Sequence, residues 1–155
     1  MREIKFRAWD PTQKTMYHVN RLDWKEDGLW AHCDNQHPRL RRIMLNTEVK
    51  PLMAFTNLHD KNGTEIWEGD IVIEQGRYPF FDGKDRGYVG IIEWVQVNCA
   101  FELVYRLINP KKAGISDGVN INLSEFIGTG EYEDLLEVIG NIYENPELLE
   151  SPPNE

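Results

Sequence analysis

The sequence predicts a mainly β protein of β-rich α+β character, and three observations support that class. Apolar and polar residues alternate with a period of two in several short segments, as they do in strands with one buried face. Turn-forming Asp-Gly and Asn-Gly pairs separate these segments, and one short helix-start pattern stands near the C-terminus. We expect N-terminal β-hairpins over residues 1–58 and a small SH3-like barrel with short helices over residues 59–155, because closure of a barrel removes exposed sheet edges.

The N-terminal segment predicts two consecutive hairpins. Residues 4–9 alternate in polarity, Asp10 can accept hydrogen bonds from the backbone that follows it, and residues 16–22 return as a second strand. A second turn is expected at residues 25–28, where an Asp-Gly pair supplies the positive φ that a tight hairpin requires.

The middle of the chain predicts further strands on either side of one strong turn signal. Residues 34–51 are expected to be irregular or to form a weak strand near residues 42–45, and a short apolar run occupies residues 52–55. Asn62-Gly63 is the strongest short-range hairpin signal in the chain. The three β-branched residues 71–73 are typical of a strand that is buried on both faces.

The C-terminal half predicts short strands joined by long loops. Alternation indicates strands at residues 89–95 and 100–106, and a final strand is expected at residues 138–143. A short helix should begin at Asn145-Pro146, because proline is favoured at the first helical position. The intervening segments are predicted as loops at residues 77–87 and 109–118 and one helical turn at residues 122–127.

Charge is distributed unevenly along the 155 residues, whose net charge is −9. Residues 1–50 hold ten Lys and Arg against seven Asp and Glu, a net charge of +3. Residues 51–155 hold seven against nineteen, a net charge of −12. Because an acidic surface repels phosphates, this distribution argues against a nucleic acid that wraps the whole protein.

The sequence predicts a protein of the cytoplasm. It contains no run of the roughly 18 apolar residues that a membrane-spanning helix needs, and its first residues alternate charge with apolar side chains instead of forming a signal peptide. In that reducing compartment Cys33 and Cys99 are expected to be free thiols.

Two groups of side chains could in principle bind a metal or act in acid–base catalysis. Four carboxylates surround the Asn-Gly turn, but their spacing does not match an EF-hand, so we interpret them as turn and surface groups: Asp60, Glu65, Glu68 and Asp70. Four potential zinc ligands match no standard spacing and are interpreted as surface histidines and one core cysteine: His32, Cys33, His37 and Cys99. The sequence therefore predicts no catalytic residue, no cofactor and no metal.

The residue 77–88 loop is the strongest candidate for a contact with a partner or a nucleic acid. Aromatic rings can stack on unpaired bases and cations can meet phosphates, although two aspartates dilute the positive charge. The alternative interpretation is a packed satellite cluster or a self-association surface. The candidate contact residues are Arg77, Tyr78, Phe80, Phe81, Lys84, Arg86 and Tyr88.

Three ordered blocks of the sequence resemble the YopX family of bacteriophage and prophage proteins. They lie at residues 4–10, at residues 53–72 and at residues 137–149. Two positions depart from the family pattern: Asn57 stands where glycine is usual, and Trp67 stands where tyrosine is frequent. Since asparagine tolerates a left-handed backbone, we expect the turn at Asn57 to be kept. The resemblance implies a phage or prophage gene in a bacterial cytoplasm and a β-rich fold, but no activity or site residue.

These observations predict a non-enzymatic phage or prophage accessory protein of unknown biochemical activity. We expect it to act through protein–protein contacts and self-association, with a second copy or a host or phage protein as its partner, and without a membrane. The alternative function is single-stranded nucleic-acid binding through the residue 77–88 loop.

Overall fold

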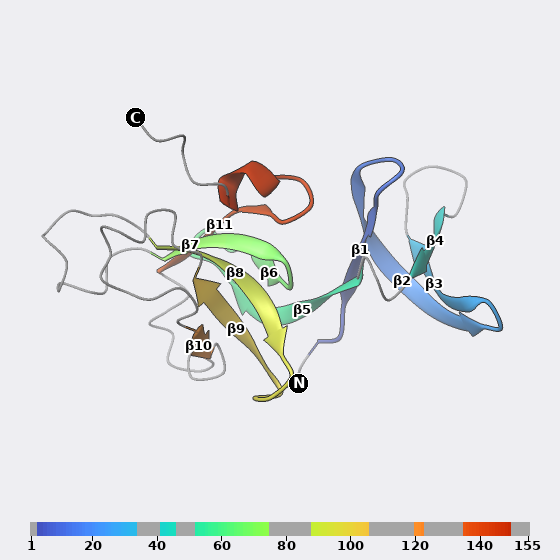
Figure 1. Cartoon of the computed structure of the whole chain (residues 1–155), viewed down its shortest axis with the longest axis horizontal. Helices are drawn as coiled ribbons and strands as arrows, with labels where there is room; N and C mark the ends of the chain where they lie inside the picture. Colours follow the sequence, from blue (N-terminus) through green and yellow to red (C-terminus); the bar gives the residue numbers. More distant parts are fainter. Residues whose placement is uncertain are drawn as a thin grey trace, which may run out of the picture. The chain divides into compact units, whose positions relative to one another are not determined.

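The computed structural model describes residues 3–33, 41–45, 52–74, 88–105, 120–122 and 135–149, and it confirms the mainly β class (Figure 1). Within these residues the chain forms eleven strands and one 3₁₀ turn. It divides into two compact units, Met1–Phe55 and Thr56–Glu155. The boundary predicted from the sequence follows residue 58, whereas these units divide after Phe55, within the strand β5.

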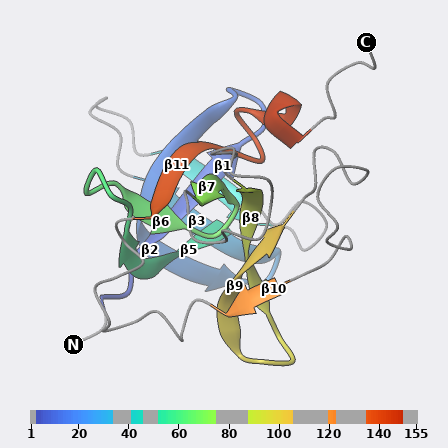
Figure 2. The same ribbon diagram turned by 90° about the vertical axis from the view of Figure 1, so that its left-hand side faces the viewer.

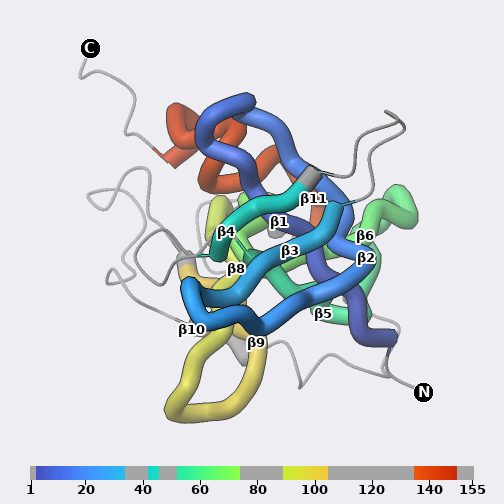
Figure 3. Tube along the Cα trace, turned by 90° about the vertical axis from the view of Figure 1, so that its right-hand side faces the viewer, coloured from blue at the N-terminus to red at the C-terminus, as the bar shows by residue number. Residues whose placement is uncertain are grey.

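Unit 1 is built from antiparallel strands that follow one another in sequence. Their neighbour order is β4-β3-β2-β1-β5, and Figure 3 shows β2, β3 and β4 side by side. The bounds are β1 Phe6–Asp10, β2 Thr15–Lys25, β3 Gly28–Cys33, β4 Arg41–Leu45 and β5 Leu52–His59. The predicted weak strand near residues 42–45 is therefore confirmed.

The first hairpin forms as predicted, with Asp10 as its turn residue. The Asp10 Oδ1 atom accepts hydrogen bonds from the backbone N–H groups of Thr12 at 2.9 Å and Gln13 at 3.2 Å. These local bonds satisfy turn amides that no neighbouring strand reaches. Strands β1 and β2 then pair from Asp10 opposite Thr15.

The second hairpin turns between Lys25 and Gly28, which face each other in the β2–β3 register. Gly28 has φ +133°, so the predicted demand for positive φ is confirmed. A β-bulge between Val19 and Arg21 shifts the register and keeps apolar residues on one face of the sheet. That face carries the buried cluster of unit 1, which consists of Ala8, Tyr17, Ala31, Cys33 and Ile43.

Unit 2 contains the end of β5, the short strand β6 and a second antiparallel sheet of order β10-β9-β8-β7-β11 (Figure 2). Its strands are β6 Glu65–Trp67, β7 Asp70–Glu74, β8 Tyr88–Val95, β9 Ala100–Tyr105, β10 Asn120–Asn122 and β11 Leu136–Asn141. Ile71 and Val72 are adjacent in β7 and both are fully buried, so the prediction of a strand buried on both faces is confirmed.

Two turns tie unit 2 together. Gly63 has φ +79° in the predicted Asn-Gly hairpin between β5 and β6. Gly69, with φ +81°, donates from its N–H to the Ile92 carbonyl at 2.7 Å and accepts at its own carbonyl from the Ile142 N–H at 2.9 Å. A single glycine thereby joins the start of β7 to β8 and to the residue that follows β11.

Two details differ from the sequence prediction and a third is confirmed. The last strand ends at Asn141 instead of residue 143, because the Asn141 Oδ1 atom accepts the N–H groups of Tyr143 and Glu144 at 3.0 and 2.9 Å and so forms a turn. Asn122 ends β10 instead of starting a helical turn, and residues 123–127 lie outside the described residues. The helix predicted at the C-terminus is confirmed as one 3₁₀ turn, Pro146–Leu149.

The SH3-like barrel stays a prediction. Among the described residues, β10 and β11 stand at opposite ends of the strand order, and no pairing between them closes the sheet. Both strands connect to loops that fall outside the description.

Candidate functional site

The loop that the sequence singled out lies almost wholly outside the described residues. Tyr88 alone belongs to a described element, since it begins β8, and its side chain is not described. The other six candidate contact residues fall outside the description: Arg77, Tyr78, Phe80, Phe81, Lys84 and Arg86. Their proposed contact with a partner or a nucleic acid therefore stays a prediction.

Asp60 is a structural carboxylate that is 4% exposed. Its Oδ1 atom accepts the N–H groups of Asn62 at 2.8 Å and Thr64 at 2.9 Å, and its Oδ2 atom accepts the N–H of Val138 at 3.0 Å. Burial raises the pKa of Asp60, but the hydrogen bonds from Val138, Thr64 and Asn62 outweigh burial and hold the pKa below its ordinary value. The carboxylate thus joins the β5–β6 turn to β11.

Asp70 has a similar local role and is 1% exposed. Its Oδ2 atom accepts the backbone N–H of Trp67 at 2.8 Å, which closes the turn around Gly69. The predicted turn chemistry of Asp60 and Asp70 is therefore confirmed. In the described part of the chain, no three His, Cys, Asp or Glu side chains are grouped so that they could hold a metal ion.

The potential zinc ligands have separate environments. His32 Nε2 lies 2.8 Å from the Asp23 carboxylate, which also accepts Arg21 Nη2 at 2.8 Å. Burial raises the pKa of Asp23, yet its contacts with Arg21 and His32 lower it below the ordinary value. Cys33 is a buried free thiol of unit 1, Cys99 is an exposed free thiol of unit 2, and His37 lies outside the described residues.

Glu102 is a carboxylate whose burial the sequence did not reveal. Alternation placed it on the opposite face of its strand from Phe101 and Leu103, but it is 2% exposed. Its Oε1 atom accepts a hydrogen bond from Asn98 Nδ2 at 2.5 Å, and in the sheet it stands opposite Glu93. Phe101 and Leu103 on one face of β9 and Glu102 and Val104 on the other are all buried, so both faces of this strand are covered.

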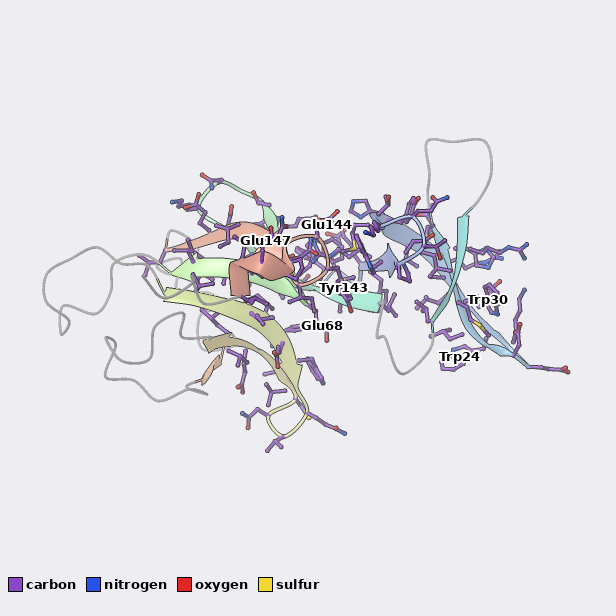
Figure 4. The ribbon with its side chains drawn as sticks, turned by 45° about the horizontal axis from the view of Figure 1, so that its top comes forward. Trp24, Trp30, Glu68, Tyr143, Glu144 and Glu147 are labelled. Atoms are coloured by element: carbon purple, nitrogen blue, oxygen red, sulfur yellow. The ribbon has the colours of Figure 1, made fainter. Side chains whose placement is uncertain are left out.

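Several acidic side chains gather beside the C-terminal turn of unit 2, where Figure 4 labels Glu68, Tyr143, Glu144 and Glu147. The Ile142 N–H bond to the Gly69 carbonyl brings the segments of Glu68 and Tyr143 together. Glu144 accepts Asn141 Nδ2 at 2.6 Å, so it supports the turn after β11. Glu144 and Glu147 are exposed, as expected for solvated carboxylates.

An apolar row that includes one strongly exposed tryptophan lies on the β2–β3–β4 sheet of unit 1. Trp24 stands opposite Leu29 in the β2–β3 register, and Leu29 stands opposite Leu45 in the β3–β4 register. Residues that are directly opposite share one face of an antiparallel sheet, so the three side chains form a row, here called the Trp24 row. Trp24 is 82% exposed, whereas Leu29 and Leu45 are partly buried.

The Trp24 row continues the core face of unit 1 towards the hairpin tip. The next row on the same face consists of Leu22, Ala31 and Ile43, of which Ala31 and Ile43 are buried. The apolar face of the sheet therefore continues from buried residues to the exposed Trp24 at the end of the hairpin. Contiguous apolar patches on the surface of a soluble protein mark contact sites, whereas single exposed apolar residues are common.

The opposite face of the same hairpin carries polar side chains that contact one another and Trp30. Trp30 stands opposite Asp23 and Met44, and Figure 4 labels it beside Trp24 on the hairpin. Its Nε1 atom donates to Asp27 Oδ1 at 2.9 Å, and Lys25 Nζ lies 5.7 Å from its ring centroid. Trp30 therefore has local polar partners, and it lies on the opposite face of the hairpin from Trp24.

A profile of the YopX protein family matches residues 5–150 of the chain, nearly its whole length. The chain belongs to the YopX family. The resemblance carried by the three sequence blocks is therefore confirmed. No curated protein matches the sequence at a significant level.

One solved structure extends the family comparison to the fold. The crystal structure of protein EF1440 from Enterococcus faecalis covers 97% of this chain and 100% of its own, with 24% sequence identity and a TM-score of 0.54. At that identity the likeness supports the fold alone.

The departure of this YopX-family chain at Asn57 has the predicted structural outcome. Asn57 has φ +69°, a left-handed conformation in which glycine is most easily accommodated and asparagine is tolerated. Beside it, Thr56 Oγ1 accepts the Leu58 N–H at 3.1 Å and donates to the Ile66 carbonyl at 2.6 Å.

Within the described residues, the chain has no helix of the length and hydropathy that would cross a bilayer.

Proposed function

We propose that this YopX-family chain is a non-enzymatic accessory protein of a bacteriophage or prophage. It acts in the cytoplasm of its bacterial host through protein–protein contacts and associates with itself. The observation that carries this proposal is the Trp24 row, whose tryptophan is 82% exposed at the end of a core face. Tryptophan is among the residues that contribute most to protein interfaces, because its large ring removes much apolar area from water at little cost in side-chain entropy.

The state of the described carboxylates supports a non-enzymatic role. Both oxygens of Asp60 and Oδ2 of Asp70 accept backbone N–H groups, so these oxygens are already used within the fold. A general base needs a free oxygen within reach of the proton that it abstracts. The two buried aspartates of the predicted acidic hairpin therefore stabilise turns.

Size-exclusion chromatography with light scattering tests the proposal. We expect the mass of the full chain to rise above that of one copy between about 5 and about 500 µM at physiological salt, which screens the repulsion between two acidic copies. A mass of one copy throughout that range would remove self-association from the proposal. A pull-down from host lysate, with the same chain as bait, then identifies any further protein partner.

Single-stranded nucleic-acid binding remains the alternative function. It depends on residues 77–88, and no side chain of that loop is described. The described residues add no observation that favours it over protein contacts.

A further inference from the structure

We propose that the Trp24 row is the surface on which a second copy of this chain docks, in a two-fold contact that places Trp24 against the same row of its partner. This inference rests on the proposed self-association and gives it a location. The occupant is another copy, and each copy presents Trp24, Leu29 and Leu45.

The charges around the row favour an apolar occupant. Side chains alternate between faces along a strand, so Asp23 and Lys25 lie on the opposite face from Trp24. Lys25 lies near the Trp30 ring, and Asp23 contacts Arg21 and His32 on that other face. The described side chains of β2, β3 and β4 on the face of the Trp24 row carry no charge, so they offer no cation to a phosphate or to an acidic peptide. An uncharged apolar surface suits it, and a second copy carries one.

The overall charge favours a contact through unit 1. Two copies with a net charge of −9 repel each other at long range. Residues 1–50, which include Trp24 and Leu45, have a net charge of +3, whereas residues 51–155 have −12. A contact through the Trp24 row thus uses the part of the sequence in which like-charge repulsion is weakest. A two-fold contact also closes on itself, which is the commonest arrangement in homo-oligomers.

The size of the row predicts a weak, concentration-dependent dimer. A tryptophan buries roughly 150–250 Å² when it is fully covered, and a stable interface buries about 800 Å² on each partner. Three apolar residues on each side fall short of that area, so the complex should dissociate on dilution. Its affinity should depend mainly on Trp24, because one central aromatic side chain often dominates a small interface.

The first experiment is sedimentation velocity on three full-length proteins over a concentration series. Trp24→Ser removes the exposed ring, and Met44→Ser is the matched control, because Met44 is 44% exposed on the opposite face of the same sheet. We expect the wild type to dimerise, Trp24→Ser to weaken dimerisation at least about tenfold, and Met44→Ser to match the wild type. Circular dichroism should be unchanged, since both side chains are exposed.

The second experiment tests the two-fold geometry and keeps Trp24 in place. Glu26 is an exposed turn residue two positions from Trp24, and Cys99 is replaced by serine to remove the exposed native thiol. We expect a short bismaleimide to cross-link Glu26→Cys/C99S into a covalent dimer and to fail when Trp24→Ser is added. Val97→Cys/C99S, at a position that is 92% exposed in unit 2, should give no dimer.

The outcomes separate this inference from the proposed function. Dimerisation of Trp24→Ser as tight as that of the wild type would overturn docking at the row and leave self-association intact. A wild type that stays monomeric would remove both. Loss of dimerisation in Trp24→Ser without cross-linking of Glu26→Cys/C99S would overturn the two-fold arrangement.

Discussion

Replacement of Asp60 by asparagine should destabilise unit 2 by removing a carboxylate that joins two distant segments. An amide oxygen can still accept the N–H groups of Asn62 and Thr64, which both bond to Oδ1. The amide nitrogen would face the Val138 N–H in place of Oδ2, so a donor would meet a donor. Asp60→Asn therefore tests the long-range bond while the local turn is kept.

The magnitude follows from the number of bonds lost. A hydrogen bond to a charged group contributes about 1.5–3 kcal/mol, so Asp60→Asn should lower the free energy of unfolding by about 2 kcal/mol. Asp60→Ala loses all three bonds, but Asn62 is exposed and water can replace its partner. We expect that variant to lose about 4 kcal/mol.

The pH dependence has a defined sign. The pKa of Asp60 is lowered in the folded state, so its carboxylate stabilises the fold at pH values above the ordinary pKa of an aspartate, about 3.9. That contribution is lost as the pH falls through the lowered pKa of the folded state. Since asparagine does not titrate, the difference between the wild type and Asp60→Asn should narrow in acid.

Urea unfolding measures both the loss in free energy of unfolding and its dependence on pH. Tryptophan fluorescence and circular dichroism should be recorded near pH 7 and in acid, and the two units should be fitted separately if their transitions do not coincide. Glu147→Gln is the matched control, because Glu147 is an exposed carboxylate of the same unit and should change stability by less than about 0.5 kcal/mol. An equally small effect of Asp60→Asn, or a difference that persists unchanged in acid, would refute the reasoning.

Three further substitutions test other parts of the structure. Asn57→Ala should cost about 1 kcal/mol in chemical denaturation and Asn57→Gly should match the wild type, because φ is +69° there; equal stability of both variants would contradict this. Gly90→Ala should lower the free energy of unfolding by about 1–3 kcal/mol, because the added Cβ would stand 2.6 Å from Leu103 Cδ1; an unchanged thermal melt would contradict it. If residues 77–88 bind single-stranded DNA or RNA, Phe81→Ala and Arg86→Ala should weaken a gel shift that also falls steeply with salt; no shift of the wild type at low salt would end that alternative.

Local chemistry explains why the hairpins could be predicted. Asp10 accepts bonds from residues two and three positions ahead of it, and Gly28 and Gly63 adopt the positive φ that their turns require. Such contacts span a few residues and depend little on the rest of the fold. The family pattern added Asn57, whose left-handed backbone could be inferred from the glycine that is usual there.

The candidate contact surface could be predicted only in part. The sequence placed Trp24 and Leu29 on paired strands across an Asp-Gly turn, which is enough to derive that they face each other. It did not indicate that Trp24 is exposed, because an aromatic residue in a strand is ordinarily buried. Exposure depends on whether another segment covers the end of the sheet.

By itself, the sequence determined the class of fold, the position of most turns and the family, since these depend on alternation and on contacts between near neighbours. Tertiary structure decided which polar groups are buried and what they bind. The Asp60 bond to Val138 joins residues that are 78 positions apart, and Glu102 is buried although it lies on the opposite face of its strand from Phe101 and Leu103. Both outcomes depend on which strands become neighbours in space, and that pairing follows from the packing of the whole unit.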